Sequence, residues 1–382
     1  MTFLPPSLDS VRASLSQRAE QLRERALHIR TALVADPRFV RWASRFPLTR
    51  GRARRQSRAL FDLSAGFVYS QVLGACVKLE VFGRLKAGPR TPEELAAETG
   101  LPATAARRLL LAAASLNLLR ALPRDRFALA DLGAAVLSNP GVAAFVAHHD
   151  LLYDDLADPV ALLRGEAQTK LSRFWPYAAD PDGDAVARYS LLMTRTQALV
   201  AEDILDAYCL ARHRTLMDVG GGEGAFLEAV AERAPYLKLM LIDLPPVADR
   251  ARVRLGGLVG RIEVYGADVL NDPLPRGADV ATLVRILHDL DDEAARTILK
   301  AVFDALPKGG AILVAEPMAG VPGVEPMGDA YFGLYLMAMR HGRPRRPQEV
   351  ANLMREAGFS GVGTLRTRDP LLVSVVMGAR RV

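Results

Sequence analysis

Short apolar runs and helical patterns alternate through the second half of the 382-residue chain. Runs of strand length occur near residues 215–219, 238–242, 262–265, 280–285 and 311–315, with two more near 361–366 and 371–377. This alternation predicts an α/β domain with a parallel, doubly wound sheet of seven strands. Ligands of such a sheet lie at the carboxyl ends of its strands.

The first half of the chain predicts helices instead. The stretch Ala59–Leu85 is apolar nearly all round, which predicts one or two buried helices suited to a dimer core. Thr91 and Glu94 form a capping box, Gly100 ends that helix, and a second helix follows. Together with a small strand at 125–129, this helix-turn-helix pattern predicts a winged-helix unit.

Between residues 150 and 214 the pattern is again helical, with breaks at Pro159, Pro176 and Pro181. This stretch carries large side chains that form a candidate roof over a ligand site: Tyr153, Trp175, Tyr177, Tyr189 and Met193. Core packing is the simpler interpretation for most of them, so we expect one or two to contact a ligand.

Positive charge is concentrated at the N-terminus. The whole chain has a net charge of +6, and residues 1–58 alone hold thirteen Arg, no Lys and four acidic residues. Leu, Val, Phe and Trp side chains are interspersed among these arginines, which favours an amphipathic helical arm. Such an arm suits nucleic acid or an anionic membrane surface, and the alternative is a solvated arm that packs on its own chain or on a partner.

A winged helix beside a basic arm raises the hypothesis of a transcription factor. Its recognition helix offers Arg107 and Arg108 but little else that can read a base edge, and apolar residues cover most of its surface. The pattern therefore favours a packing helix and no nucleic-acid partner.

Two features bear on the compartment of the protein. No uninterrupted apolar run approaches the length of a membrane span, and the N-terminus lacks an apolar signal segment, which together predict a cytoplasmic protein. Cys76 and Cys209 offer neither a metal-ligand pattern nor a disulfide framework. We expect both to be small core residues and no metal to be bound.

The stretch Leu216–Val230 predicts a strand that ends in an acid, a glycine turn and then a helix. Its residues Asp218, Gly220, Gly222 and Gly224 are spaced D-x-G-x-G-x-G, whereas a dinucleotide site needs G-x-G-x-x-G. This spacing favours S-adenosylmethionine, because that cofactor has no pyrophosphate to place on a helix N-terminus. For the glycines alone, a tight strand-to-helix turn without a ligand is the alternative.

Candidate ligand contacts follow the next two strands. Asp243 ends the second strand, where a carboxylate can accept hydrogen bonds from both hydroxyls of a ribose. After the third strand, Asp268 can accept from an adenine amino group and Val269 can lie on the ring. A turn aspartate is the alternative for Asp268.

The fourth and fifth strands supply candidate acid–base chemistry. Arg285, His288 and Asp289 follow the fourth strand, and a histidine at this edge, beside a glycine turn, is a candidate general base. Glu316 ends the fifth strand at the same edge. Its carboxylate can hold the imidazole by the other ring nitrogen.

Six stretches together resemble class I S-adenosylmethionine-dependent O-methyltransferases of the plant caffeate and acetylserotonin type: LMDVGGGEG, LIDLPPV, GADVL, LVRILHDLDDE, LVAEPM and the terminal AGFSGV. The resemblance spans residues 59–380. Within this family the chain most resembles the carotenoid hydroxyl methyltransferases of purple phototrophic bacteria, and the Arg-rich arm contributes to that match. The resemblance implies a Rossmann-like methyltransferase sheet, an N-terminal helical winged dimerisation domain, a homodimer and S-adenosylmethionine as cofactor.

The resemblance also implies roles for individual residues. Cofactor contacts are expected from Met193, Asp218, Gly220, Gly222, Asp243, Leu244, Asp268, Val269 and Arg285, the last at a place where the family often has a lysine. His288 matches the family's catalytic base, and Asp289 and Glu316 match residues beside it. Arg345 stands where the family often has a second glutamate, so we expect the two-carboxylate clamp around the base to be incomplete.

We expect four segments: a basic amphipathic arm (1–58), a winged-helix-like dimerisation domain (59–150), a helical linker and substrate-pocket segment (151–214), and a cofactor-binding catalytic domain (215–382). The expected substrate is a hydrophobic small molecule, an acyclic carotenoid with a hydroxyl group. A second apolar segment can hold it or can be plain core: Tyr331, Phe332, Leu336, Met337 and Met339.

A carotenoid substrate would also give the basic arm a role, as a peripheral contact with the inner photosynthetic membrane. Two alternatives stay open. One is a methyltransferase of another substrate, such as a phenolic polyketide or a bacteriochlorophyll precursor. The other is a regulatory protein that keeps the fold without catalysis.

Overall fold

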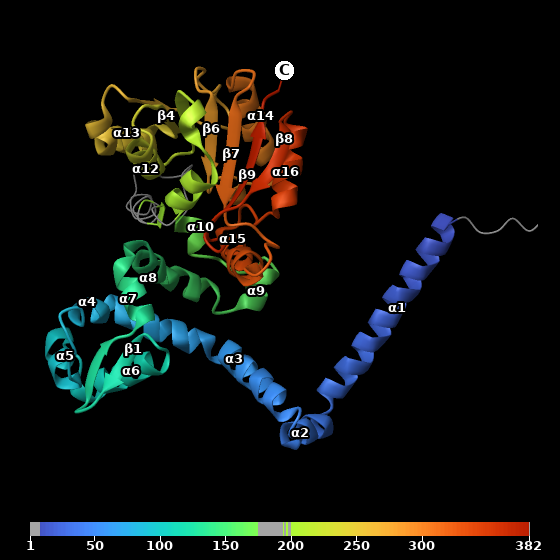
Figure 1. Cartoon of the computed structure of the whole chain (residues 1–382). Coiled ribbons are helices and arrows are strands. Elements are labelled where there is room, and N and C mark those ends of the chain that lie inside the picture. The colour runs from blue at the N-terminus through green and yellow to red at the C-terminus, as the bar shows by residue number, and fades with distance from the viewer. Residues whose placement is uncertain (1–7, 175–193, 195, 198–199, 382) are drawn as a thin grey trace, which may run out of the picture. The chain divides into compact units, whose positions relative to one another are not determined.

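The computed structural model describes residues 8–174, 194, 196–197 and 200–381 (Figure 1). The chain forms two compact units, Met1–Leu73 and Gly74–Val382, and the boundary between them lies inside a helix. The division into four segments expected from the sequence stays a prediction.

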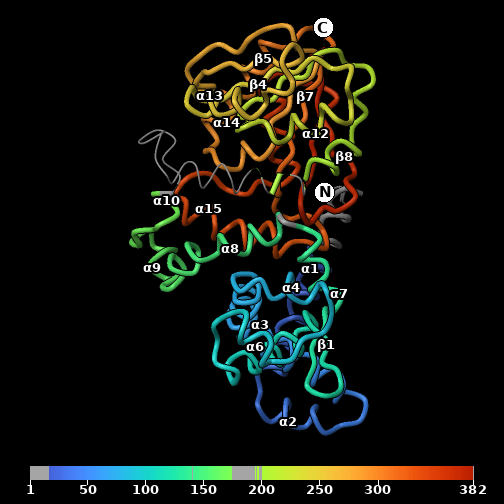
Figure 2. The backbone as a smooth tube through the Cα atoms, turned by 90° about the vertical axis from the view of Figure 1, so that its left-hand side faces the viewer, coloured from blue at the N-terminus to red at the C-terminus, as the bar shows by residue number. Residues whose placement is uncertain are grey.

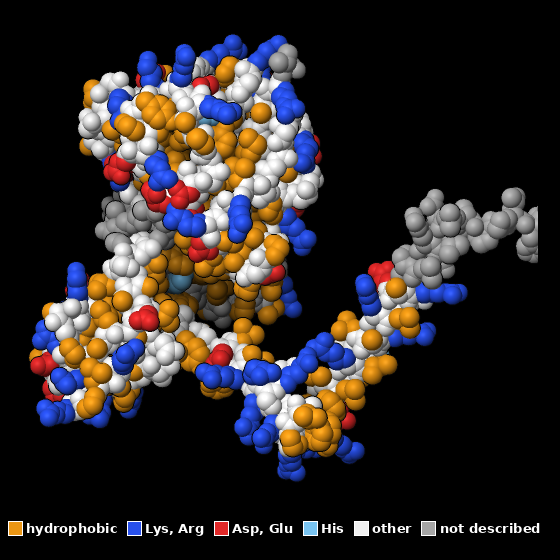
Figure 3. All heavy atoms as spheres, in the orientation of Figure 1, with side chains coloured by type: hydrophobic (Ala, Val, Ile, Leu, Met, Phe, Trp, Pro, Cys, Tyr) orange, Lys and Arg blue, Asp and Glu red, His pale blue; other side chains and the backbone are white. Residues whose placement is uncertain are grey.

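Three helices make up the described part of the first unit: α1 (Leu8–Ala35), α2 (Pro37–Arg45) and most of α3 (Arg50–Lys78). Asp36 caps α2, because its side chain accepts a hydrogen bond from Arg38 N at 2.7 Å. Large apolar side chains are exposed along α1 and α2, among them Leu22, Leu27, Ile29, Leu33, Val34, Val40, Trp42 and Phe46. In Figure 3 hydrophobic side chains and Lys or Arg side chains alternate over the helices of this unit, and the amphipathic arm stays a prediction.

Helix α3 is exposed in the single chain. Leu60, Phe61, Leu63 and Phe67 are each at least 64% exposed in the single chain, so burial of this part of Ala59–Leu85 in a dimer core stays a prediction. The same helix is long and apolar enough to cross a membrane by length and composition, which corrects the expectation that no run approaches a span. Length and composition alone do not distinguish such a span from a helix that packs against protein.

The second unit begins with small helices and a hairpin: α4 (Val81–Arg84), α5 (Pro92–Thr99), α6 (Ala103–Ser115), β1 (Leu119–Leu122), β2 (Arg126–Leu129) and α7 (Asp131–Ser138). The capping box of Thr91 and Glu94 starts α5, and Gly100, at φ 71°, ends it. The two strands pair antiparallel, and β2 lies where the wing strand was predicted. Cys76 is buried as expected, whereas Cys209 is exposed, so its prediction as a core residue is wrong.

A second group of helices packs together beneath the sheet (Figures 1 and 2). It contains α8 (Pro140–Asp155), α9 (Pro159–Leu163), α10 (Leu171–Phe174), the π-helical turn η4 (Pro326–Phe332) and α15 (Gly333–Met339). Leu152, Leu162, Leu171, Leu336 and Met339 form its apolar core. Segments that are far apart in the sequence therefore meet here.

The seven-stranded sheet has the order β5-β4-β3-β6-β7-β9-β8. Its strands are β3 (Thr215–Val219), β4 (Lys238–Asp243), β5 (Ile262–Gly266), β6 (Val280–Val284), β7 (Ala311–Glu316), β8 (Ser360–Leu365) and β9 (Ser374–Ala379). All seven lie where the sequence predicts strands. The prediction of a wholly parallel sheet is wrong at one strand, because β9 inserts between β7 and β8 and pairs antiparallel with both.

Helices cover both faces of this sheet: α12 (Ala225–Arg233), α13 (Pro245–Arg254), α14 (Asp292–Ala305) and α16 (Pro347–Glu356). Alternate strand residues point to opposite faces. Met217 and Ile242 belong to the core with α14 and α16, and Leu216 and Leu241 to the core with α12. Short 3-10 turns connect these elements: η1 (Leu210–Arg212), η2 (Leu255–Leu258) and η3 (Leu287–Asp289).

Candidate active site

The glycine turn between β3 and α12 forms the floor of the main cavity. Gly220, Gly222 and Gly224 have φ values of 72°, 58° and 85°, which favour glycine. A Cβ atom on Gly220 would lie 2.5 Å from the side chain of Ile286, and one on Gly224 would lie 2.4 Å from that of Leu255. The turn therefore needs glycine both for its backbone conformation and for close packing.

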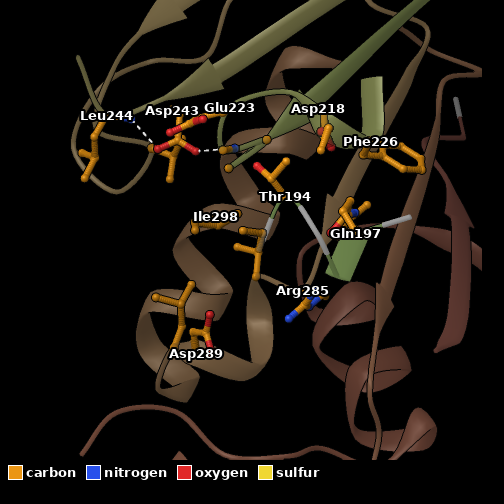
Figure 4. A pocket seen from close by; sticks show the side chains of 18 of the residues that line it. Thr194, Gln197, Asp218, Glu223, Phe226, Asp243, Leu244, Arg285, Asp289 and Ile298 are labelled. Atoms are coloured by element: carbon orange, nitrogen blue, oxygen red, sulfur yellow. Dashed lines mark hydrogen bonds between the residues drawn. The ribbon is translucent and has the colours of Figure 1, made fainter. Parts of the chain in front are cut away.

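A cavity of about 290 Å³ lies over this turn (Figure 4). Nine residues predicted to bind the cofactor or to act in catalysis line it: Asp218, Gly220, Gly222, Asp243, Leu244, Asp268, Val269, Arg285 and Asp289. Met193 lies outside the described residues. Thr194 and Gln197 also line the cavity and were missed, because their helical segment carries no pattern that identifies a ligand wall.

Asp243 is fixed at the end of β4. Its carboxylate oxygens accept hydrogen bonds from Gly222 N and Leu244 N, each at 2.8 Å. Burial raises the pKa of Asp243 to about 6, and the two backbone hydrogen bonds and Arg250 oppose this shift. The carboxylate is thus held in one orientation at the cavity wall, as a contact to two neighbouring hydroxyls requires.

Asp218, at the end of β3, has one carboxylate oxygen without a partner. Its Oδ1 accepts from Thr282 Oγ1 at 2.6 Å, while Oδ2 is buried and lacks a hydrogen-bond partner in the described structure. Burial raises the pKa of Asp218 to about 7, and nearby Asp243 contributes to the increase. An unpartnered oxygen at the cavity edge fits a cationic amine of a ligand.

The loop after β5 supports both interpretations of Asp268. Its carboxylate accepts from Leu270 N at 3.0 Å and from Asn271 Nδ2 at 2.7 Å, which is the arrangement of a turn aspartate. Asp268 and Val269 nevertheless line the main cavity. A carboxylate can accept further hydrogen bonds, so the turn contacts leave room for a ligand contact.

A second, smaller cavity adjoins the first and contains the candidate base. Arg285 and Asp289 line both cavities, whereas His288 lines only the second. Arg285 holds a left-handed backbone conformation at the end of β6, with φ 61°, and donates to Thr196 Oγ1 at 2.9 Å. A non-glycine residue in this conformation is typical of functional sites.

His288 is buried beside Asp289, and its Nε2 lies 3.2 Å from Asp289 Oδ1. Burial, with contributions from Arg285 and Arg345, lowers the pKa of His288 to about 3, so the imidazole is neutral at physiological pH. Burial also raises the pKa of Asp289, and Arg285 opposes that shift. A neutral imidazole beside a carboxyl group can take up a proton.

Glu316 does not contact the imidazole, which corrects the expectation that it holds the other ring nitrogen. Its Oε2 accepts from the backbone N–H of His288 at 3.0 Å, and its carboxylate also accepts from that of Leu287. Nδ1 of His288 is buried without a partner among the described residues. Glu316 therefore fixes the backbone of the loop that carries the base, while Asp289 contacts the ring.

Arg345 fixes the same loop from the other side and is fully buried. Its guanidinium donates to Leu290 O at 2.8 Å, to Leu287 O, and to Asp292 Oδ1 at 2.7 Å. The residue expected in place of a second carboxylate thus holds backbone carbonyls, and no second carboxylate contacts the described imidazole ring. Asp289 is the carboxylate that lies beside the imidazole in the described structure.

Several residues of the second cavity were missed by the sequence analysis. Phe145 and His148 come from α8 and Tyr335 from α15, and they join the predicted Tyr331, Phe332, Leu336 and Met339. Met337 is 41% exposed and does not line the cavity, so its predicted role is wrong. No sequence signal identified α8, because its histidines are separated from β6 by more than a hundred residues.

Comparison with known domain families agrees with this architecture. Residues 153–360 match the O-methyltransferase domain, and residues 61–139 match the O-methyltransferase dimerisation domain. The first match contains the glycine turn, the loop of His288 and the lining of the first cavity, whereas Phe145 and His148 of the second cavity lie outside it. The second fits a homodimer.

Individual proteins are similar over nearly the whole chain. The demethylspheroidene O-methyltransferase of Cereibacter sphaeroides is 46% identical over 356 residues, which cover 91% of this chain and 93% of that protein. The demethylspheroidene O-methyltransferase of Rhodobacter capsulatus is 41% identical over 357 residues, which cover 92% of this chain and 89% of that protein. Human N-acetylserotonin methyltransferase in complex with S-adenosylmethionine has the same fold, with a TM-score of 0.75, 23% identity, and coverages of 86% and 98%.

The family match, the similarity to these enzymes and the cavity over a D-x-G-x-G-x-G turn lead to one conclusion. The chain belongs to the S-adenosylmethionine-dependent O-methyltransferase family and carries that family's dimerisation domain.

Proposed function

We propose that this enzyme methylates the hydroxyl group of an acyclic carotenoid. One observation carries the proposal: the similarity to the two demethylspheroidene O-methyltransferases extends over about nine-tenths of each chain. The second cavity, of about 30 Å³, has Phe145, Phe332, Leu336 and Met339 beside the polar groups of His288 and Asp289, so it offers apolar contacts next to the hydroxyl end of such a substrate. Transfer of a labelled methyl group to hydroxylated acyclic carotenoids, with caffeate as the competing acceptor, tests the proposal.

In this proposal four residues of the main cavity contact different parts of the cofactor. S-adenosylmethionine supplies an electrophilic methyl group whose departure leaves a neutral thioether. Asp243 accepts from the ribose hydroxyls, and the unpartnered oxygen of Asp218 accepts from the amino group. Leu244 and Val269 pack against the adenine.

Replacing Asp243 with alanine is expected to weaken binding of S-adenosylhomocysteine by about tenfold or more, because the ligand loses its hydrogen bonds to a charged carboxylate. The variant also loses the acceptor that holds Gly222 N, so the glycine turn becomes less rigid. Isothermal titration calorimetry measures the change. Asp249→Ala, exposed on α13 and outside the cavity lining, is the control, and equal affinity of Asp243→Ala and wild type contradicts the ribose contact.

Cofactor affinity is expected to fall as the pH decreases from 8 to 5.5. The raised pKa values of Asp218, about 7, and Asp243, about 6, mean that both become protonated in this range. The carboxylate forms are the stronger acceptors for the ligand, so binding then releases protons and affinity declines by up to about tenfold per pH unit for each group.

Calorimetry with S-adenosylhomocysteine in two buffers of different ionisation enthalpy measures this proton release directly. In the Asp218→Asn variant we expect the release near pH 7 to disappear. Affinity that is constant from pH 8 to pH 5.5 contradicts the assignment of both carboxylates.

His288 and Asp289 act on the acceptor hydroxyl. Bound S-adenosylmethionine would supply the methyl group to the hydroxyl oxygen, and orientation of the acceptor by the cleft residues would contribute about 7 kcal/mol or more in favourable cases. A tertiary alkyl alcohol is a weak acid, so its proton leaves during or after methyl transfer. His288 accepts that proton, and the adjacent Asp289 stabilises the resulting imidazolium.

The N-terminal arm of the enzyme contacts an anionic membrane surface in this proposal. Phe39 and Trp42 of α2 and the C-cap residue Phe46 form one aromatic row, with ring centroids 5.7 and 5.0 Å apart, and Trp42 is 51% exposed. Arg41 and Arg45 are also exposed on this helix. Aromatic side chains among arginines are typical of helices that lie in the membrane interface, where polyenes also reside.

Removing residues 1–58 is expected to abolish binding to phosphatidylglycerol vesicles, since each arginine near an anionic surface contributes about 1 kcal/mol. Flotation of the full chain and the truncated chain measures the difference, with phosphatidylcholine vesicles as the neutral comparison. Equal flotation of the two proteins contradicts a membrane role for the arm. A Trp42→Ser, Phe46→Ser variant separates the aromatic contribution from that of charge.

A further inference from the structure

Two histidine–tyrosine pairs connect α8 to the segment that covers the second cavity. His148 Nε2 lies 2.8 Å from the hydroxyl oxygen of Tyr335, and His149 Nε2 lies 2.9 Å from that of Tyr331. The two tyrosine rings stack with centroids 5.9 Å apart. Four polar groups thus stand in an otherwise apolar wall, where each needs a hydrogen-bond partner.

The two pairs differ in their relation to the reaction site. His148 and Tyr335 both line the cavity that contains His288 and Asp289, whereas His149 does not. Burial is the main cause that raises the pKa of Tyr335, and the charge of Asp289 adds to it, which places the tyrosine within electrostatic reach of the catalytic loop. Only the first pair therefore has both members at the acceptor site.

His288 alone has a limited capacity to accept the proton of the acceptor hydroxyl. Its Nε2 faces Asp289 at 3.2 Å, and its Nδ1 is buried without a partner in the described structure. A second group that can take a proton would therefore help an acceptor that enters this cavity.

We propose that Tyr335 and His148 form a second proton relay for the acceptor hydroxyl. The inference rests on the proposed function, because it assumes an alkyl alcohol in the second cavity. In this relay the acceptor O–H proton passes to the Tyr335 oxygen as the tyrosine proton passes to His148 Nε2. The oxygen of the alcohol forms its new bond to the methyl carbon, the carbon–sulfur bond breaks, and the proton resides on His148 as an imidazolium.

The acidities favour this transfer. Burial, together with His149, lowers the pKa of His148 to about 4, so the imidazole is neutral and can accept a proton at physiological pH. An alcohol oxygen that has gained a methyl group and still holds its proton is a far stronger acid than a protonated imidazole. Proton loss to His148 is therefore downhill even though its basicity is reduced.

His148 positions Tyr335 and accepts the proton through it. Variants at position 148 can distinguish this role from a purely structural one. Glutamine at position 148 can keep a hydrogen bond to the tyrosine but cannot hold the proton as an imidazolium. We expect His148→Gln and His148→Phe to lower kcat by about tenfold or more, and Tyr335→Phe to do the same. KM for S-adenosylmethionine is expected to stay unchanged, since neither residue lines the main cavity.

His149→Gln and His149→Phe are the matched controls, because His149 makes the same kind of contact from the same helix without lining the cavity. All variants are assayed as full-length protein on a hydroxylated acyclic carotenoid in detergent, with melting temperatures recorded to confirm folding. Wild-type kcat in His148→Gln or in Tyr335→Phe overturns the relay. If the wild-type enzyme methylates no carotenoid, the proposed function fails, and the relay fails with it.

Discussion

Replacing His288 with alanine is expected to lower kcat by about 100-fold or more, the usual contribution of a general base. Affinity for S-adenosylhomocysteine is expected to stay within about twofold of the wild type. The two effects separate because His288 lines the acceptor cavity but not the cofactor cavity. Single-turnover kinetics and calorimetry measure them independently.

His341→Ala is the control for this substitution, since His341 is exposed and lines neither of the cavities described above. Its kcat is expected to equal that of the wild type. Wild-type turnover in a folded His288→Ala variant removes His288 from the mechanism.

Replacing Arg345 with alanine is expected to lower the free energy of unfolding by about 3 kcal/mol and to reduce kcat as well, because the fully buried guanidinium is the donor for two backbone carbonyls and a buried acceptor left without its donor costs about 1–3 kcal/mol. The substitution leaves the carbonyl oxygens of Leu287 and Leu290 without their donor. Because these residues flank His288, the base loses its fixed position. Thermal unfolding and single-turnover kinetics measure the two effects.

Arg343→Ala is the matched control, because Arg343 pairs with the same Asp292 at 3.2 Å from an exposed position. An exposed pair contributes about 1 kcal/mol or less, so we expect little change in melting temperature. If Arg345→Ala is as stable and as active as Arg343→Ala, the buried arginine does not position the loop.

The cofactor side of the site was predictable from sequence for a geometric reason. Parallel strands bring their carboxyl ends to one edge of the sheet, so Asp218, Asp243 and His288 could be placed together from strand patterns alone. In the structure Asp218 lies near the end of β3, Asp243 ends β4, and His288 follows β6. Hydrophobic periodicity was therefore sufficient to predict where these three residues lie in the fold.

The acceptor side was not predictable in the same way. His148 and Tyr335 are 187 residues apart in sequence, and no strand periodicity relates α8 to α15. Glu316 and Arg345 hold backbone N–H and C=O groups of the His288 loop, and side-chain contacts to backbone leave no pattern in the sequence. The position of Glu316 at the same sheet edge as His288 led to the prediction of an imidazole contact, and the hydrogen bond to the backbone N–H of His288 corrects it.

The exposure of α3 has a related cause. Its apolar residues predicted a buried helix, and burial depends on what lies against that helix. The match to the dimerisation domain begins at residue 61, within α3. A second copy of the chain would account for its apolar surface.

The central claim is tested most directly by a methyl-transfer assay with labelled S-adenosylmethionine. The full chain is offered a hydroxylated acyclic carotenoid in detergent, and in parallel caffeate and a bacteriochlorophyllide. We expect label in the carotenoid fraction alone, with the His288→Ala variant as the blank. Label in caffeate or the bacteriochlorophyllide but not in the carotenoid contradicts the proposed substrate, and transfer to none of the three contradicts the account of the acceptor site.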